Sequence, residues 1–212
     1  DRRLLGKRVK LLKDKLARVT SQREVQRRAR RRASVLSVSL VGYTNAGKST
    51  LFNALTRGSA YAADQLFATL DTTTRRVFLP GGAPLVVSDT VGFIRQLPHT
   101  LVAAFRATLE EAVQADLLLH VVDAGSGTRA AQIAAVNLVL AEIGADRIPQ
   151  VMVYNKIDLN GAAPRIERDE YGKISGIWIS ARTGAGLDLA KQALEEYAAA
   201  ATGNPVVHSA AA

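Results

Sequence analysis

Residues 42–49 read Gly-Tyr-Thr-Asn-Ala-Gly-Lys-Ser and fit the phosphate-binding pattern G-x-x-x-x-G-K-[ST]. They directly follow the apolar run 35–41, and residues 48–56 are expected to form a helix. In such a loop, glycines let backbone N–H groups face the α and β phosphates, Lys48 reaches the β and γ phosphates, and the Ser49 hydroxyl binds Mg²⁺. The residues expected to contact the nucleotide here are Gly42, Tyr43, Thr44, Asn45, Ala46, Gly47, Lys48, Ser49 and Thr50. The stretch predicts a nucleoside triphosphate binder; the alternative is a glycine-rich turn without a chemical role.

The composition limits the classes of protein to consider. With 212 residues, 48% of them hydrophobic, the chain is long enough for one ordinary core and an extension. No stretch approaches about 18 consecutive apolar residues and no signal peptide opens the chain, so we expect a cytoplasmic protein without a transmembrane anchor. The absence of cysteine excludes disulfides, thiolate metal sites and cysteine nucleophiles. Because the chain begins at Asp1 rather than Met, we expect an N-terminal portion to be missing; we further expect a monomer.

The positive charge is concentrated in residues 1–34, called the basic segment below. It holds 14 Lys and Arg against 3 Asp and Glu, whereas residues 35–212 hold 14 against 16. Apolar residues recur in it at alternating steps of four and three, the spacing of a helix that packs against another helix, so residues 4–27 are expected to be mostly helical. These residues are Leu5, Val9, Leu12, Leu16 and Val19. Two interpretations of the arginine-rich end that follows remain open, a solvated surface helix and a contact with a polyphosphate such as RNA.

From residue 35 onward, segments typical of strands alternate with segments typical of helices. The expected strands are 35–41, 75–79, 85–88, 117–122, 150–154 and 174–179, and the expected helices are 48–56, 100–115, 128–143 and 187–200. The turn Pro80-Gly81-Gly82-Ala83 indicates an antiparallel hairpin between the second and third strands. We therefore predict an α/β doubly wound fold with a mostly parallel six-stranded sheet, one antiparallel edge pair and helices on both faces.

Further motifs follow expected strands at the same sheet edge as the phosphate loop. Asp89-Thr90-Val91-Gly92 follows strand 85–88, where an acidic residue completes a Mg²⁺ site and a glycine N–H meets a γ-phosphate. Asn155-Lys156-Ile157-Asp158 follows strand 150–154; the Asp158 carboxylate can accept hydrogen bonds from the N1–H and the amine of guanine, which adenine does not present together. Ser180-Ala181 follows the last strand, where the Ala181 N–H is expected to meet the guanine carbonyl oxygen. These motifs predict guanine selectivity, with a polar turn as the alternative for residues 155–158.

The motifs together resemble the translation-factor class of GTPases and, in detail, the HflX family of ribosome-associated GTPases. The resemblance covers residues 1 to about 200 and rests on residues 42–49, Phe67-Ala68-Thr69-Leu70-Asp71, Asp89-Thr90-Val91-Gly92-Phe93-Ile94, Asn155-Lys156-Ile157-Asp158 and Ser180-Ala181-Arg182. It implies that residues 67–71, 89–92 and Arg182 also contact the nucleotide. It further implies that Lys48, Thr69 and Gly92 act in catalysis and that Ser49, Thr69 and Asp89 hold Mg²⁺. Spacing alone leaves Thr72, Thr73 and Thr74 as alternatives to Thr69.

The same resemblance implies a domain organisation and a function. Residues 34–200 would form a P-loop NTPase G domain, residues 1–33 the end of a helical linker domain, and residues 201–212 a disordered tail. The activity implied is hydrolysis of GTP to GDP and phosphate, and the full-length protein would bind the large ribosomal subunit, through ribosomal RNA, and split stalled ribosomes. The alternative is a GTP-dependent RNA- or protein-binding switch module in ribosome assembly, with hydrolysis serving only to reset it.

One departure from Ras-like proteins bears on the rate of hydrolysis. Phe93 stands where those proteins carry a water-orienting glutamine, and a phenyl ring cannot align water, so slow intrinsic hydrolysis is expected. The ribosome or a monovalent cation would then supply the missing stabilisation. Asn45 is a candidate K⁺ ligand, with local backbone hydrogen bonding as its alternative role. Surface ion pairs are expected for Arg75, Arg76 and Arg95, and core positions for His120 and Trp178.

Overall fold

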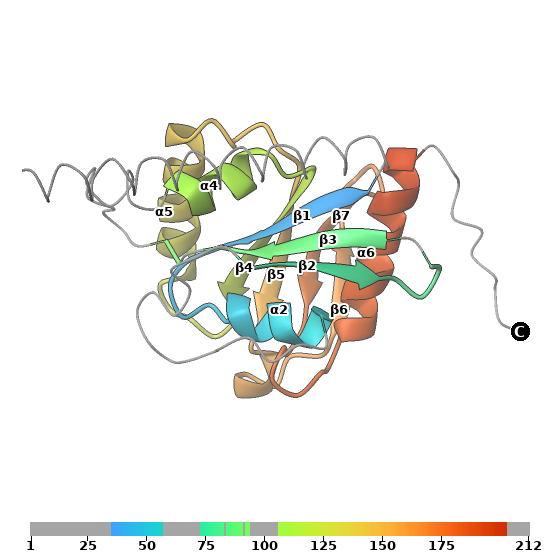
Figure 1. Ribbon diagram of the computed structural model, residues 1–212. Coiled ribbons are helices and arrows are strands. Elements are labelled where there is room, and N and C mark those ends of the chain that lie inside the picture. Colours follow the sequence, from blue (N-terminus) through green and yellow to red (C-terminus); the bar gives the residue numbers. More distant parts are fainter. Residues whose placement is uncertain (1–34, 57–72, 83, 91, 94–105, 203–212) are drawn as a thin grey trace, which may run out of the picture. The chain divides into compact units, whose positions relative to one another are not determined.

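The computed structural model describes residues 35–56, 73–82, 84–90, 92–93 and 106–202 (Figure 1). The helices and strands given below all lie in one compact unit, Leu36–Ala212. The helix predicted at 4–27, the ion pair predicted for Arg95, positions 100–105 of the helix predicted at 100–115, and positions 203–212 of the tail lie outside the described residues.

Within the described residues, a seven-stranded sheet has the order β2-β3-β1-β4-β5-β7-β6 (Figure 1). The parallel strands are β1 Leu36–Val41, β3 Pro84–Asp89, β4 Leu117–Asp123, β5 Gln150–Asn155 and β7 Ile174–Trp178. At the two edges, β2 Thr73–Phe78 pairs antiparallel with β3, and β6 Arg165–Arg168 pairs antiparallel with β7. Strand β1 lies between β3 and β4, so the order reverses there, and the carboxyl end of such a strand is where open α/β sheets bind ligands.

The prediction of six strands with one antiparallel edge pair was wrong, because β6 was missed. Its four residues read Arg-Ile-Glu-Arg, with a single apolar side chain. A short edge strand pairs on one side only, so it does not need the continuous apolar run that marks a strand buried on both faces. The other strands lie within two residues of their predicted bounds, and the predicted hairpin is present as the antiparallel pair of β2 and β3.

Helices cover both faces of the sheet, as predicted (Figure 1). The helices described are α2 Lys48–Thr56, α4 Arg106–Val113, α5 Arg129–Glu142 and α6 Leu187–Thr202, with a short 3₁₀ helix, η1 Ile157–Leu159. On one face, α2 and α6 contribute Phe52 and Leu194 to a core with the strands. On the other face, α4 and α5 contribute Leu109 and Leu140 to a second core. Helix α6 extends two residues beyond its predicted end at Ala200.

The two residues expected in the core differ in their surroundings. His120 on β4 is 1% exposed, and burial lowers its pKa to about 4, although Gln150 opposes that shift through a hydrogen bond. Trp178 is half-buried instead, so that prediction was wrong. Its ring stacks on Tyr154 with centroids 4.5 Å apart, and its Nε1 donates to Glu167 at 2.8 Å. The indole lies next to the edge strand β6, where the Arg165 guanidinium lies 3.8 Å from the ring centroid.

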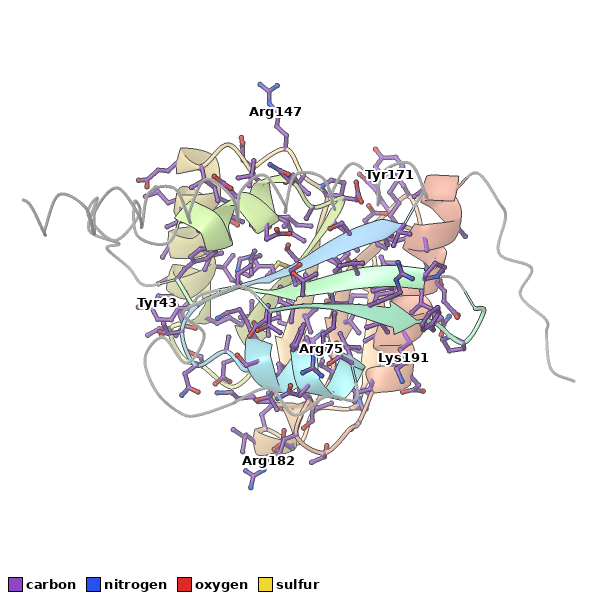
Figure 2. The ribbon with its side chains drawn as sticks, viewed as in Figure 1. Tyr43, Arg75, Arg147, Tyr171, Arg182 and Lys191 are labelled. Carbon is purple, nitrogen blue, oxygen red and sulfur yellow. The ribbon has the colours of Figure 1, made fainter. Side chains whose placement is uncertain are left out.

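Several cations project from the surface of the described unit (Figure 2). Arg147, before β5, points into solvent. Arg75 on β2, for which a surface ion pair was expected, lies with its guanidinium 5.9 Å from the centroid of the Phe52 ring. That contact joins the edge strand β2 to α2, so Arg75 packs against the domain.

Candidate nucleotide-binding site

The predicted motifs meet at the carboxyl edge of the sheet. The phosphate loop follows β1, Asp89 ends β3, Asn155 ends β5, and Ser180 comes two residues after β7. Because these four strands are parallel, their carboxyl ends share one edge. The structure therefore brings together, around the end of β1, residues that are more than 130 positions apart in the sequence.

The phosphate loop takes a path that side chains would block. Gly42 has a φ of 148°, and a Cβ there would lie 2.2 Å from the carbonyl oxygen of Val121. Gly47 has a φ of 92°, and a Cβ there would lie 2.3 Å from Nδ2 of Asn155. Asn45 is exposed and has a φ of 59°, a left-handed conformation that Asn tolerates better than most residues. Tight turns of this type form anion-binding concavities.

Lys48 begins α2 and lies buried against the loop. Its Nζ donates to the carbonyl oxygens of Gly42, at 3.1 Å, and Tyr43, at 3.0 Å. Burial lowers the pKa of Lys48 to about 8, while the nearby Asp89 carboxylate partly opposes that shift. A buried ammonium gains electrostatic energy when an anion binds beside it, so Lys48 is placed to attract phosphate. Thr50, in the first turn of α2, is half-buried.

The hydroxyl and carboxylate expected to bind Mg²⁺ are in contact. The Ser49 hydroxyl donates to Oδ2 of Asp89 at 2.7 Å, and Asp89 is 2% exposed. Both are oxygen ligands of the kind that Mg²⁺ prefers, and the ion usually takes its remaining ligands from water and phosphate. Among the described residues, no group of three or more His, Cys, Asp or Glu could hold a metal. The neighbouring Thr90 hydroxyl donates to the Leu40 carbonyl at 2.6 Å, which ties this turn to β1.

The chain returns from β3 to the phosphate loop through Gly92 and Phe93. The Phe93 N–H donates to the Gly42 carbonyl at 3.1 Å, and the Thr44 N–H donates to the Phe93 carbonyl at 2.9 Å. A Cβ at Gly92 would lie 2.8 Å from Thr44 Cγ2 and 3.2 Å from Lys48 Nζ, so the approach of this segment to the loop requires glycine. The Phe93 ring is fully buried in the core beneath α4 and α5. It therefore anchors residues 92–93 in this core.

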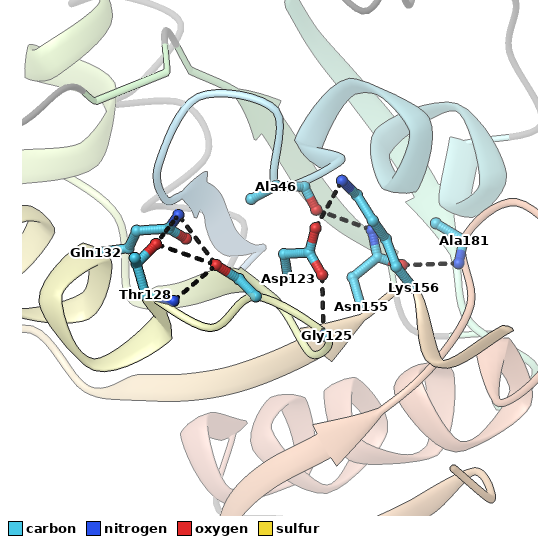
Figure 3. A network of polar contacts seen from close by, with 9 residues as sticks. Ala46, Asp123, Gly125, Thr128, Gln132, Asn155, Lys156 and Ala181 are labelled. Atoms are coloured by element: carbon cyan, nitrogen blue, oxygen red, sulfur yellow. Dashed lines mark hydrogen bonds and ion pairs between the residues drawn. The ribbon is translucent and has the colours of Figure 1, made fainter. Parts of the chain in front are cut away.

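Asn155 connects the two loops that lie on either side of it. Its Nδ2 donates to the Ala46 carbonyl at 3.0 Å, and its Oδ1 accepts the Ala181 N–H at 2.9 Å (Figure 3). The Ala181 N–H was expected to meet the guanine carbonyl oxygen, but in this structure it is donated to Asn155. The amide therefore fixes the spacing between the phosphate loop and the loop after β7.

Asp158, the predicted guanine-reading carboxylate, is held by Ser180. The Ser180 hydroxyl donates to Oδ1 of Asp158 at 2.6 Å and accepts the Thr183 N–H at 3.1 Å. Asp158 itself lies exposed in η1. Arg182 projects away from the fold close to η1 (Figure 2).

Lys156 makes a contact that the sequence analysis did not foresee. Its Nζ lies 2.9 Å from Oδ2 of Asp123, the last residue of β4, and Oδ1 of Asp123 accepts the Gly125 N–H at 2.9 Å (Figure 3). The signal available in the sequence was an acidic residue directly after the apolar run 117–122. Its partner depends on the order of the strands in the sheet, because Lys156 comes close to Asp123 only where β4 and β5 are neighbours.

Several predicted contacts lie outside the described residues. They are Phe67, Ala68, Thr69, Leu70, Asp71 and Val91. The role of Thr69 as a catalytic residue and Mg²⁺ ligand therefore stays a prediction. Of its alternatives, Thr73 pairs in register with Asp89, and the Thr74 hydroxyl lies 3.1 Å from that of Ser88.

Comparison with known families shows that one GTPase family model covers most of these motifs. Residues 37–156, more than half of the chain, match the family described as 50S ribosome-binding GTPase. That stretch contains the phosphate loop, Asp89 and Asn155. The chain belongs to this family. The α/β P-loop fold predicted from the sequence is confirmed by this membership of the 50S ribosome-binding GTPases and by the observed sheet.

Relatives within this GTPase family confirm the resemblance to HflX. The chain is 56% identical over 197 residues to GTPase HflX of Escherichia coli, covering 92% of this chain and 46% of that protein. It is 48% identical over 195 residues to GTPase HflX of Caldanaerobacter subterraneus, covering 92% and 44%. The chain thus spans less than half the length of these relatives.

Solved structures agree with the family assignment at the level of the fold. A GTP-binding protein from Sulfolobus solfataricus, solved in complex with GDP, has a TM-score of 0.61 and 28% identity, covering 78% of this chain and 53% of that one. Era from Aquifex aeolicus, at 23% identity and a TM-score of 0.60, covers 76% and 56% and shows the same fold. Among the described helices, none has the length and apolar character needed to span a membrane.

Proposed function

We propose that this chain binds GTP with Mg²⁺ and hydrolyses it to GDP and phosphate. The observation that carries the proposal is the shared sheet edge at β1, the strand where the sheet order reverses. The buried Lys48, the Ser49–Asp89 pair and Asp158, which is held by Ser180, lie at this edge. Mg²⁺ would neutralise charge on the phosphates. The Lys48 ammonium would stabilise charge that develops at the β and γ phosphates. The Asp158 carboxylate would select guanine by accepting hydrogen bonds from the N1–H and the amine of the base.

Hydrolysis by the chain alone is proposed to be slow. The Phe93 ring is buried in the core, so the residue that replaces the usual glutamine takes no part in orienting water. Thr69 and the Gly92 N–H would contribute at the γ-phosphate. Asn45, exposed at the rim of the loop, would hold a K⁺ ion whose charge supplements that of Lys48.

The large ribosomal subunit is the proposed activator. The family description and the HflX relatives support ribosome binding. We propose that the basic segment contacts ribosomal RNA. We further propose that a full-length protein, of the length of the HflX relatives, splits stalled ribosomes in the cytoplasm. Residues 1–33 would be the end of a helical linker domain, and the chain would act as a monomer.

GTP turnover by the purified chain, with and without large ribosomal subunits, tests this function. The expected result is slow release of phosphate by the chain alone and a clear increase with subunits. Running both reactions in KCl and in NaCl at equal ionic strength tests the K⁺ proposal, since turnover should be higher in KCl. The Asn45→Ala variant should abolish that difference and leave GDP binding in place.

Three outcomes would contradict parts of the proposal. Failure to bind GTP would overturn the function as a whole. GTP-dependent binding to subunits without any stimulation of turnover would favour the switch module, in which hydrolysis only resets the bound state. Equal turnover in KCl and NaCl would exclude the K⁺ role of Asn45 and leave the ribosome as the activator.

A further inference from the structure

Asp123 forms a corner between the ends of two neighbouring strands (Figure 3). Each of its carboxylate oxygens has a partner: one pairs with the Lys156 ammonium at 2.9 Å, and the other accepts the Gly125 N–H at 2.9 Å. The Ala124 N–H donates to the Asn155 carbonyl at 2.8 Å, directly beside this pair. The loop after β4 and the loop after β5 are therefore joined by both backbone and side chain.

Lys156 is held in a conformation that needs such support. Its φ of 67° places it in the left-handed region, which is unfavourable for a long side chain and which persists where the surroundings enforce it. A Cβ built at Gly47 would lie 4.0 Å from Lys156 Cε, so the side chain passes alongside the phosphate loop before it reaches Asp123. The methylene stem is thus fixed at one end by its backbone and at the other by the Asp123 carboxylate.

A guanine nucleotide in the proposed site would lie along the methylene stem of Lys156. Its phosphates would lie in the loop that includes Gly47, and its base edge would meet Asp158, two residues after Lys156. The nucleoside between them would rest on the Lys156 methylenes, where it would exclude water from an apolar surface. The orientation of that surface depends on the ammonium remaining at Asp123.

We infer that Asp123 is a positioning residue that slows the release of guanine nucleotide by holding Lys156 in place. This inference rests on the guanine site proposed above and assigns it a residue outside the predicted motifs. The two side chains are 23% and 24% exposed, so the ion pair itself contributes little to folding, and its main effect is on the bound nucleotide.

The rate of release of radiolabelled GDP into excess unlabelled GDP tests the inference. Asp123→Asn keeps an oxygen for the Gly125 N–H but removes the charge that holds Lys156. Release should become about three- to fivefold faster, the size expected for a partly exposed ion pair. Glu167→Gln is the control, because it removes the charge of an ion pair with Arg165, away from the site, and keeps an oxygen for the Trp178 Nε1–H, so release should not change.

Two further measurements separate positioning from general distortion. Lys156→Met keeps the stem without the ammonium, so adding Asp123→Asn to it should produce no further acceleration. Competition by inorganic pyrophosphate, which lacks the nucleoside, should be equal for Asp123→Asn and the unmodified chain.

The inference is overturned if Asp123→Asn leaves GDP release unchanged, if it accelerates release equally in the Lys156→Met background, or if pyrophosphate binding weakens by the same factor. Because release of GDP needs neither hydrolysis nor ribosomes, these outcomes would leave the proposed GTPase function standing. A chain that binds no GDP would instead overturn that function and this inference with it.

Discussion

The Lys48 side chain is buried, and its ammonium has two loop carbonyls as partners. Loss of hydration lowers its pKa to about 8, and the attraction of Asp89 limits the fall. A triphosphate bound in the loop would replace the lost water with negative charge and raise the pKa again. The protonation state of one side chain is therefore coupled to nucleotide binding.

That coupling predicts proton uptake on binding at mildly alkaline pH. At about pH 8.5 a substantial fraction of Lys48 is neutral in the free chain, whereas the nucleotide-bound chain keeps it charged. GDP binding should then take up a fraction of a proton, and affinity should fall as pH rises above about 8. Calorimetry in buffers with different ionisation enthalpies measures the uptake. At about pH 6.5, where Lys48 is charged in both states, this contribution should vanish; its absence at both pH values would contradict the coupling.

Residues 92–93, which follow β3, are held in place by one buried ring. Phe93 is 0% exposed and shares its core with Leu109 and Ala112 of α4, while its backbone bonds to the phosphate loop on both sides. A residue that looks, from its position in the motif, like a substitution for a catalytic side chain thus has a packing role. It joins the phosphate loop to the second core.

Phe93→Ala should therefore be strongly destabilising. Removing a fully buried phenyl ring costs about 3–5 kcal/mol of unfolding free energy, from lost burial and from the cavity that remains. Phe78→Ala is the matched control: Phe78 is 67% exposed, and a surface change of this kind costs about 0.5 kcal/mol or less. Denaturant unfolding of the two variants measures both values. A loss below about 1 kcal/mol for Phe93→Ala would show that α4 does not depend on this anchor.

At the scale of helices and strands, the sequence patterns predicted the features that depend on consecutive residues. Five parallel strands were predicted from apolar runs, and the site motifs from residues that directly follow those runs, as at Asp89 and Asn155. Strand β6 was not predicted, because its stability comes from pairing with β7 and not from its own apolar content. The Asp123–Lys156 ion pair was not predicted for a related reason: the two residues lie 33 positions apart and meet only because β4 and β5 are neighbours.

The whole chain divides its charge unevenly between its two parts. The basic segment carries 14 Lys and Arg against 3 Asp and Glu, and residues 35–212 carry 14 against 16. A nearly neutral G domain offers no strong general attraction for RNA, so we propose that the basic segment supplies the electrostatic part of ribosome binding. The segment contains no aromatic residue for base stacking, which favours contacts with phosphates.

Replacing the arginine cluster of this segment should weaken ribosome binding and its dependence on salt. The five residues to change to Gln are Arg27, Arg28, Arg30, Arg31 and Arg32. Fewer phosphate contacts release fewer counterions, so the plot of affinity against salt concentration should become less steep, with GTP binding intact. A control with Gln at the exposed Arg76, Arg147 and Lys173 should behave like the unmodified chain. Equal subunit affinity and salt slope for the two variants would assign the RNA contact elsewhere.

The charged strands at the two edges of the sheet affect whether other polypeptides can pair with this domain. An edge strand presents unpaired N–H and C=O groups to any extended peptide, and charged side chains or a bulge discourage such pairing. Strand β2 carries Arg75 and Arg76, and β6 carries Arg165, Glu167 and Arg168, with an irregularity between the last two. If the protein acts on stalled ribosomes, as proposed, it would work close to unfinished polypeptides that have not yet folded. Edges of this kind would keep its sheet from recruiting those polypeptides into aggregates.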